Sequence, residues 1–328
     1  MPSFGVFLPT FGYPAITMDH LKASAKEAER LGFDSLQVAD HPIYTEGLAA
    51  FGQKGIYDPL VTLAQLAAVT QRIRVGAGVL LVPLRHPLML AKMIATLDVA
   101  SHGRVDMGVG IGAYEPDYES TGVTFKTRGR AYDEGLELMT RLWTTDKVTF
   151  KGQFYQLDNV GVEPKPHQKP HPPLWFGGGV PRVWERAAKY GAGWGPWAPT
   201  IEHMKEGMAA IKDQAKKIGR DMAGFRFIVE AWTAIGYDLS TCEDAVRPAL
   251  SYFIKHHQMD IGMEFMHTNS FIGSPEKIAD RIQQFVDIGV TEFHFSFCPW
   301  ESCLESMRLM AEEVLPRFQG ARSSGPAA

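Results

Sequence analysis

The 328-residue sequence contains only three cysteines, Cys242, Cys298 and Cys303. A small and odd number of cysteines in a long chain supports neither a disulfide framework nor a cysteine-rich metal site. Because free cysteine is among the most frequently buried residue types, we expect three reduced and packed thiols. The CxxxxC spacing of Cys298 and Cys303 assigns them no role by itself.

Long apolar runs and a dominant charge are also missing. No stretch approaches the ~20 apolar residues that span a bilayer, and Met1-Pro2-Ser3-Phe4 does not begin a charged and apolar leader. With 33 basic and 37 acidic side chains, the formal net charge of −4 offers no basic track for a phosphate backbone. We therefore expect a cytoplasmic protein with neither a membrane nor a nucleic-acid partner. The histidines lack HxH and HExxH spacing, so no metal centre is expected.

The chain does contain enough apolar material for a large core, with 45% hydrophobic residues. Short β-rich runs alternate with longer segments of helical period, a pattern typical of a parallel sheet with crossover helices. The eight expected strands are Phe4–Leu8, Ser35–Asp40, Ile73–Val82, Val105–Ile111, Leu174–Gly177, Gly193–Pro196, Arg226–Ile235 and Glu292–Phe297. Helices are expected at Met18–Leu31, Leu88–Val99, Val183–Tyr190, Ile201–Ile218 and Ile278–Ile288.

Eight strand–helix alternations predict an α/β fold, a (β/α)8 TIM barrel formed as a single domain by residues 1–322. A doubly wound open sheet is the main competitor, but no glycine-rich turn follows the first strand. We expect insertions at about 113–173 and 240–271 and a flexible tail at 323–328. The first insertion should hold a helix over Tyr132–Trp143, a hairpin of Val148–Phe150 with Phe154–Leu157, and a proline-rich connector.

In such a barrel the chemistry lies where the strands end. The second strand ends in Asp40-His41-Pro42. Because an imidazole generally titrates near neutrality, a histidine at this point could act as a general acid or base, while Asp40 could orient His41 or contact a cofactor. A hydrogen-bonded loop histidine explains the dipeptide equally well when it is taken alone.

Glycines interrupt two of the apolar strands. Gly76 and Gly78 lie within the third strand, where either a closely approaching ligand or a bulge in the barrel wall would require them. The fourth strand contains Gly108-Val109-Gly110-Ile111-Gly112, which lacks the continuation of a dinucleotide fingerprint. Alternating glycines would instead leave one face of this strand flat, as a planar ring requires.

The run Gly177-Gly178-Gly179 joins the fifth strand to the start of a helix. Consecutive backbone amides at a helix N-terminus form an anion cradle suited to a phosphate. The competing explanation is a flexible turn without a ligand, although three glycines cost more backbone entropy than a turn needs. At the next strand, Trp194 could flank an aromatic ring or belong to the barrel core.

Taken in order, these segments resemble the luciferase-like monooxygenase superfamily and, more closely, its F420-dependent branch. The resemblance covers nearly the whole chain, so the series is more specific than any one motif. The matching segments are Arg72–Gly76, Leu84–Lys92, Ala95–Arg104, Gly108–Gly112, Asp117–Glu119, Arg128–Arg130, Pro164–Pro166 and Pro172–Gly178.

This resemblance implies a bacterial luciferase-like barrel with insertions, a cofactor at the C-terminal mouth, and a homodimer. It also implies a cis peptide between Gly78 and Val79 that supports the cofactor ring from behind. By the same resemblance, Gly177, Gly178 and Gly179 hold the cofactor phosphate. Asp40 and His41 face the ring and the substrate.

The cofactor is expected to be coenzyme F420, with FMN as the alternative. Asp40-His41-Pro42 resembles the F420 enzymes, whereas many FMN-dependent relatives have Glu-His-His at this point. Ala113 stands where sugar-phosphate dehydrogenases of the F420 branch have a carboxylate, which disfavours a sugar phosphate as the substrate. The expected function is hydride transfer to or from a small organic substrate. Alternatives are an FMN-dependent monooxygenase with a separate flavin reductase and a flavin-binding barrel without catalysis.

The second insertion is rich in methionine and phenylalanine. These side chains either line an apolar substrate pocket or form a core patch, which is the more common use of such residues. The residues concerned are Met259, Met263, Phe265, Met266 and Phe271.

Overall fold

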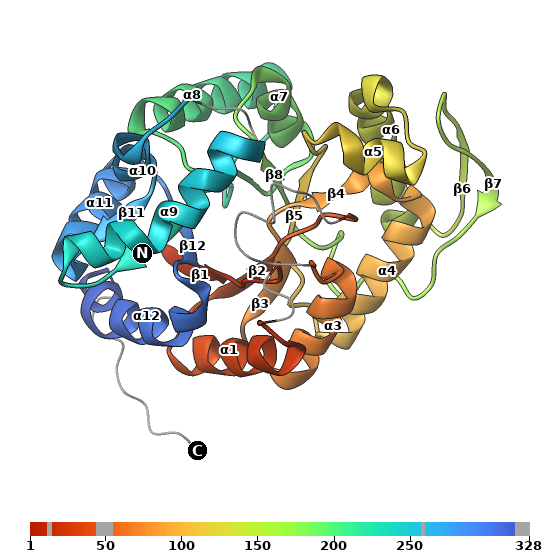
Figure 1. The fold of residues 1–328 in the computed structure, drawn as a ribbon. Helices are drawn as coiled ribbons and strands as arrows, with labels where there is room; N and C mark the ends of the chain where they lie inside the picture. The colour runs from red at the N-terminus through yellow and green to blue at the C-terminus, as the bar shows by residue number, and fades with distance from the viewer. Residues whose placement is uncertain (12–14, 44–54, 257–259, 319–328) are drawn as a thin grey trace.

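The computed structural model describes residues 1–11, 15–43, 55–256 and 260–318. A sheet of parallel strands occupies the centre, and helices surround it (Figure 1). The strands of this sheet are β1 Ser3–Phe7, β2 Ser35–Val38, β3 Arg74–Ala77, β4 Leu80–Leu81, β5 Met107–Gly110, β8 Leu174–Gly177, β9 Gly193–Gly195, β10 Arg226–Ile235, β11 Phe271–Gly273 and β12 Glu292–Phe297.

The sheet closes into a barrel through its third strand. Its order is β3-β2-β1-β12-β10-β9-β8-β5-β4, and β3 and β4 are consecutive pieces of one chain segment. A parallel bridge between Val75 and Val105 joins β3 to the segment that leads into β5. All the pairings in this order are parallel, so the predicted (β/α)8 barrel is confirmed.

The expectation of one continuous strand over Ile73–Val82 is wrong. A cis peptide joins Gly78 to Val79, as the resemblance implied, and separates β3 from β4. The two pieces also have different partners, because β3 pairs with β2 while β4 pairs with β5. The third strand is therefore bent at the level where the strands end.

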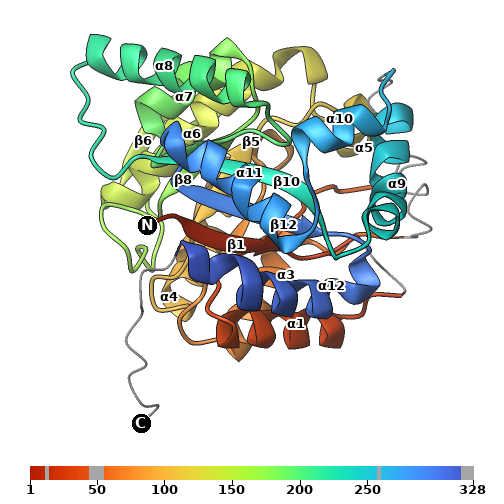
Figure 2. The same ribbon diagram turned by 90° about the vertical axis from the view of Figure 1, so that its left-hand side faces the viewer.

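The helices cover the outside of the barrel, and Figure 2 shows α1, α11 and α12 beside β1, β10 and β12. Ser274 caps α11 by accepting a hydrogen bond from the Lys277 amide, and Pro275 occupies its first turn. Two outer helices, α3 and α12, were not predicted. The outer helices are α1 Met18–Arg30, α3 Pro59–Val69, α4 Pro87–Ala100, α6 Arg128–Thr144, α7 Pro181–Tyr190, α8 Ile201–Lys217, α11 Pro275–Asp287 and α12 Cys303–Leu309.

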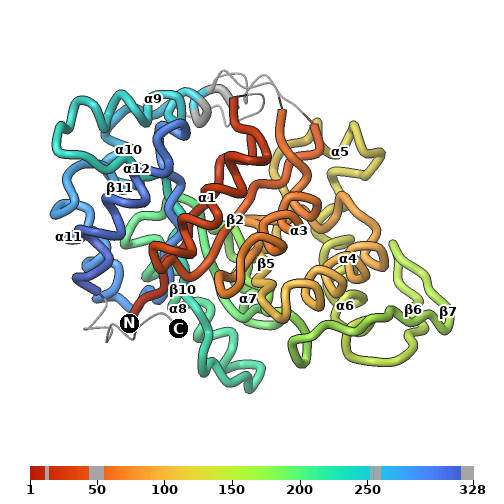
Figure 3. Tube along the Cα trace, turned by 90° about the horizontal axis from the view of Figure 1, so that it is seen from below, coloured from red at the N-terminus to blue at the C-terminus, as the bar shows by residue number. Residues whose placement is uncertain are grey.

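Residues 113–173 contain the predicted hairpin, formed by β6 Val148–Lys151 and β7 Gln156–Val160 in antiparallel pairing. The hairpin projects from the side of the barrel, whereas the short helix α5, Glu115–Thr121, lies at the end opposite the N-terminus (Figure 3). Helix α9, Leu239–His256, lies at this same end. These two helices therefore flank the end at which the parallel strands finish.

Methionines of the second insertion pack into a core cluster. Met266 is fully buried in α10, Met263–Asn269, and Met263 and Phe265 pack against the same cluster. Phe271 lies in the unpredicted strand β11, which pairs with β10, and it joins the main core. Met259 and the tail at 323–328 lie outside the described residues.

All three cysteines are free and buried, as expected. No helix in the described part of the chain is long and apolar enough to cross a membrane.

Candidate active site

A cavity of about 590 Å³ opens where the barrel strands end. Its wall is predominantly apolar, and its residues come from most of the barrel strands and the loops that follow them. The described lining residues are Phe7, Phe11, Ala39, Asp40, His41, Gly78, Val79, Leu81, Gly110, Ile111, Gly112, Ala113, Tyr114, Arg128, Gly177, Gly178, Gly179, Val180, Val183, Gly195, Trp197, Glu230 and Trp232. Most residues that the sequence predicted for the site are brought together here.

The glycine run forms one side of the cavity. Gly177 ends β8, and Gly178 has φ +111°, a backbone conformation that side-chain-bearing residues rarely adopt. The parallel pairing of Gly177 with Gly195 directs the Gly178 amide toward the Gly195 carbonyl, whereas the Gly179 amide has no backbone partner among the described residues. Val180 then caps α7 without a side-chain hydrogen bond. This side of the cavity therefore presents backbone donors at the positive end of a ten-residue helix.

Trp194 is not one of the lining residues. Its side chain is fully buried, and its indole Nε1 donates a hydrogen bond of 2.7 Å to the carbonyl oxygen of Gly178. Trp194 therefore supports the glycine run from the core side, which agrees with the second of the two explanations that the sequence left open, a place in the barrel core.

Gly76 also lies away from the cavity. A Cβ at this position would lie 1.8 Å from the backbone oxygen of Asp106, so contact between adjacent strands requires this glycine. At Gly110 and Gly177, a Cβ would meet the side chain of Val79 at 2.6 and 2.4 Å. Val79 therefore occupies part of the flat surface that we expected to face a ring.

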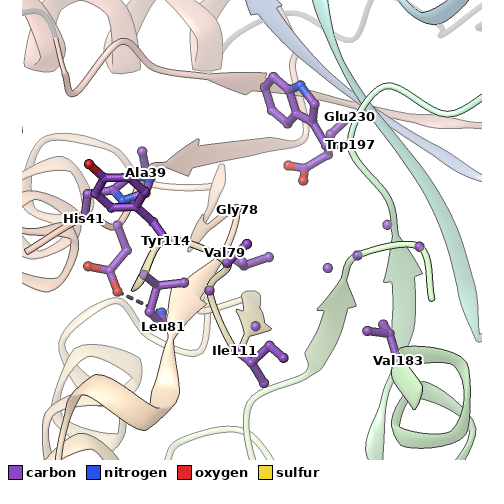
Figure 4. Close-up of a pocket in the computed structure, with 18 of the residues that line it drawn as sticks. Ala39, His41, Gly78, Val79, Leu81, Ile111, Tyr114, Val183, Trp197 and Glu230 are labelled. Atoms are coloured by element: carbon purple, nitrogen blue, oxygen red, sulfur yellow. Dashed lines mark hydrogen bonds between the residues drawn. The ribbon is translucent and has the colours of Figure 1, made fainter. Parts of the chain in front are cut away.

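Asp40 lines the cavity, but its carboxylate is engaged by the protein. The two oxygens accept hydrogen bonds from Arg85 Nη1 at 2.5 Å and from Nη2 at 2.9 Å. A third bond, 2.8 Å from the Leu81 amide, is drawn in Figure 4. This arrangement ties the end of β2 to β4 just after the cis peptide. The geometry favours a positioning role for the Asp40 carboxylate over direct proton transfer.

His41 is paired with a carboxylate that the sequence did not single out as a site residue. Its Nδ1 lies 3.0 Å from Oδ2 of Asp117, a residue in the first turn of α5. The Asp117 side chain is 1% exposed and that of His41 is 23% exposed. A buried carboxylate at Nδ1 orients the ring. Asp117 belongs to the segment Asp117–Glu119 that carried the family resemblance, which was the available signal.

Three aromatic side chains form much of the apolar wall. Trp197 contacts Phe7 and Trp232 edge-on, with ring centroids 5.5 Å apart in both pairs. Figure 4 places Trp197 near Glu230, and His41 and Tyr114 lie on the other side of Val79 in that view. Such a wall favours a planar, apolar ligand.

Glu230 is an ionisable residue in this wall that the sequence analysis missed. It is 2% exposed on β10, and its Oε1 lies 3.2 Å from Nδ1 of His294 on β12. Nε2 of His294 lies 2.9 Å from Oε1 of Glu292. Burial lowers the pKa of His294, but the two carboxylates outweigh burial and raise this pKa to about 9. Burial raises the pKa of Glu230 above its ordinary value, and the hydrogen bond from His294 offsets part of this rise.

The described residues include no cluster of histidine, cysteine and carboxylate side chains that could hold a metal ion. The cavity instead combines an apolar slot, backbone donors at a helix N-terminus and two histidine–carboxylate pairs. Such a site suits an organic cofactor with a planar ring and a phosphate.

Comparison with known proteins identifies the family and the fold. The family model described as luciferase-like monooxygenase matches residues 2–292. The oxygenase component of flavin-dependent trigonelline monooxygenase from Acinetobacter baylyi is 24% identical, with 92% of this chain and 94% of that protein covered.

Two solved structures have similar backbones. The monooxygenase RslO1 from Streptomyces bottropensis has a TM-score of 0.83 at 25% identity, and the match covers 97% of this chain and all of that one. An F420-dependent secondary alcohol dehydrogenase, solved with an F420–acetone adduct, also has a TM-score of 0.83, at 21% identity and with 97% and 99% coverage. At that identity, the likeness to the dehydrogenase shows the shared fold alone.

Proposed function

Because the chain belongs to the luciferase-like monooxygenase family, we propose that it is an F420-dependent oxidoreductase that transfers a hydride to or from a small organic substrate. The observation that carries this proposal is the position of the His41–Asp117 pair and the Gly177-Gly178-Gly179 run in one apolar cavity. A proton-transfer group and a phosphate cradle are the two parts that such a reaction requires of the protein.

The residues present fit a ring cofactor with a phosphate. The glycine run would hold the phosphate through the Gly179 amide and the N-terminus of α7. Gly78 and Val79 would lie behind the ring, and Asp40 would keep this bend in place through the Leu81 amide. The aromatic wall formed by Phe7, Trp197 and Trp232 would contact an apolar substrate.

The deazaflavin ring of F420 supplies hydride transfer when it is bound, and it does not support oxygen activation. His41 gives or removes the proton that the substrate exchanges along with the hydride. Asp117 would hold the His41 ring through Nδ1 while His41 exchanges the proton. The apolar wall excludes water and strengthens the charge interactions within the cavity.

The charge of the cavity supports F420 over FMN. Among the described lining residues, Arg128 is the one lysine or arginine, and its guanidinium lies 3.5 Å from the Phe125 ring centroid. Arg128 also donates a hydrogen bond to the Phe125 carbonyl oxygen. A cradle built mainly of amides suits the phosphodiester of F420, which carries a single charge. The terminal phosphate of FMN carries a charge of about −1.5 to −2 near neutral pH.

An FMN-dependent monooxygenase is the second candidate. It is favoured by the flavin-dependent oxygenase component that is 24% identical over most of the chain. In that case the partner would be a separate flavin reductase, and reduced FMN with oxygen would supply the chemistry. A flavin-binding barrel without catalysis is the third candidate, and the His41–Asp117 pair argues against it.

Paired binding isotherms for F420 and FMN distinguish the first two candidates. We expect F420 to bind in the micromolar range or tighter and FMN to bind at least about tenfold more weakly, a difference of about 1.4 kcal/mol. Tighter binding of FMN would favour the monooxygenase, and binding of neither would contradict both functions.

We also propose that the protein forms a homodimer. Four apolar side chains are exposed on the neighbouring helices α3 and α4, namely Val61, Met89, Met93 and Val99. Light scattering should return about twice the chain mass of 36.4 kDa, and Met89→Glu should shift the protein toward the monomer. A wild-type mass of 36.4 kDa at micromolar concentration would contradict the dimer.

A further inference from the structure

Three ionisable side chains form a hydrogen-bonded line inside the barrel, on two adjacent strands. Glu230 on β10 and His294 on β12 are register partners, and Glu292 lies two residues before His294. The three side chains are at most 3% exposed. This line is separate from the His41–Asp117 pair, which comes from the β2 end and α5.

One end of the line reaches a charged layer where the strands begin. Glu292 accepts hydrogen bonds from Arg74 at 3.0 Å and from Arg226 at 2.8 Å, and both arginines also pair with Asp106. The Arg74 side chain is 30% exposed, so this layer is in contact with solvent. Burial raises the pKa of Glu292, but His294 and the two arginines outweigh it and hold this pKa well below its usual range.

The other end of the line is the cavity. Glu230 lines the cavity beside the bent third strand, and a Cβ on Gly78 would lie 2.5 Å from its Oε1. Figure 4 shows the Glu230 carboxylate near Trp197, apart from His41. The line therefore connects the cavity wall with the opposite end of the barrel.

The charged groups around the His294–Glu230 pair cancel one another, and the pair itself shares one proton that can be transferred. Arg74, Arg226, Asp106 and Glu292 balance one another, and the Trp175 ring is the aromatic neighbour of His294. A single proton between Nδ1 and Oε1 then gives either imidazolium with carboxylate or imidazole with carboxylic acid. Both forms carry the same total charge, so the proton can move without creating a buried net charge.

We propose that Glu230 is a second proton-exchanging residue of the cavity, that His294 and Glu292 recharge it, and that it serves the cofactor ring while His41 serves the substrate. This inference rests on the proposed F420 function. Two proton sites are needed because both partners of the hydride transfer change their protonation.

The atoms balance for oxidation of an alcohol. The carbon-bound hydrogen leaves as a hydride to the ring, and the hydroxyl proton moves to His41, which yields a ketone. Glu230 would give the proton that it shares with Nδ1 of His294 to the reduced ring, which leaves a Glu230 carboxylate beside a neutral His294. One proton from solvent then restores the pair, while His294 keeps its Nε2 proton hydrogen-bonded to Glu292. Ketone reduction reverses each step.

The first test needs no cofactor. Nuclear magnetic resonance of protein labelled with ¹³C-histidine gives the pKa of His294, with its signal assigned by its loss in His294→Asn. We expect Glu230→Gln to lower this pKa by about 1–3 pH units, because one of two neighbouring negative charges is removed. A matched control is Glu243→Gln, since Glu243 pairs with His267 at 2.8 Å outside the cavity. An unchanged His294 pKa in Glu230→Gln would overturn the relay, even if cofactor binds.

The second test reads the carboxyl group directly. Infrared difference spectra of the bound cofactor, oxidised against chemically reduced and without substrate, should contain a Glu230 carboxyl band. This band should shift in D₂O, disappear in Glu230→Gln and return at a new position in Glu230→Asp. A spectrum that is identical in wild type and Glu230→Gln would overturn the assignment of Glu230 to the ring.

Kinetics separate this inference from the function on which it rests. Glu230→Gln should leave the dissociation constant of the cofactor unchanged and slow single-turnover hydride transfer by roughly 10²–10⁴-fold. Glu230→Asp should restore part of the rate, and Glu243→Gln should retain all of it. If neither cofactor binds to the wild type, the proposed function and the ring assignment both fail, while the histidine titration still decides the relay. If the Glu230→Gln variant kept the full rate, then Glu230, His294 and Glu292 would form a structural network without a role in proton transfer.

Discussion

The two sides of the cavity are built from different chemistry. The side at Gly177, Gly178 and Gly179 consists of backbone, and its donors are fixed by the turn into α7. On the other side, Asp40 and His41 are ionisable side chains, and each is held by a residue from a different element, Arg85 or Asp117. Backbone donors suit a constant charge such as a phosphate, whereas a paired imidazole suits a proton that comes and goes. Binding and chemistry should therefore be separable by mutation.

The largest effect is expected on the backbone side. Gly178→Leu should abolish cofactor binding, with a loss of at least about 100-fold, because hydrogen bonds to a charged group contribute about 1.5–3 kcal/mol each. Gly224→Leu is the matched control, since Gly224 also has a positive φ, +73°, and open space around it. Both variants should fold, as circular dichroism can check. Full cofactor affinity in a folded Gly178→Leu protein would contradict the cradle.

Substitution of Asp40 tests the junction between the backbone side and the side-chain side of the cavity. Asp40→Ala leaves Arg85 without its main partner, so we expect a loss of unfolding free energy toward the lower end of about 3–5 kcal/mol, as Arg85 is partly exposed. Cofactor affinity and rate should both fall, because Leu81 loses its anchor. Asp58→Ala is the control: it removes the other acceptor of Arg85 and the cap of α3, at a cost of about 1 kcal/mol. Urea unfolding measures both. An equal loss in the two variants would remove the special role of Asp40.

The pH dependence of folding stability tests the buried histidine, His294, which lies apart from the His41 side of the cavity. The folded-state pKa of His294 rises from 6.5 to about 9, which is worth about 3 kcal/mol. Because this pKa is raised, the contribution is fully present below pH 6.5 and is lost as the pH rises through about 9. Wild type should therefore lose more stability than His294→Asn between pH 6.5 and 9.5 in urea titrations. Parallel curves for the two proteins would contradict this account.

The sequence predicted the barrel well because its signal is local. Each strand is a short apolar run, and the turn residues that follow it are in the same few positions of the chain. The cis peptide at Gly78–Val79 was predicted from family resemblance alone. Helix α3 was missed because Pro59–Val69 is apolar on most of its sides and shows no clear helical period.

The site was less predictable because its pairs are distant in the chain. His41 and Asp117 are 76 residues apart, and Glu230 and His294 are 64 apart, so no local pattern links them. A signal for the second pair did exist. Glu230 and His294 each stand inside an otherwise apolar run, where an ionisable residue needs a buried partner. A cofactor contact was one of two explanations for Gly76 and for Trp194, and both residues contact the protein interior, because glycine and tryptophan serve packing as readily as binding.

The separation of binding from chemistry is tested most directly by His41→Ala. The measurement is the dissociation constant of F420 together with the single-turnover rate of hydride transfer from pH 6 to 9. We expect the dissociation constant to stay within about twofold and the rate to fall by roughly 10²–10⁴-fold, the usual contribution of a positioned proton donor. A wild-type rate across this pH range would make His41 a structural residue and move attention to Tyr114, which lines the same cavity. A parallel loss of affinity and rate would contradict the division of the cavity into a binding side and a chemical side.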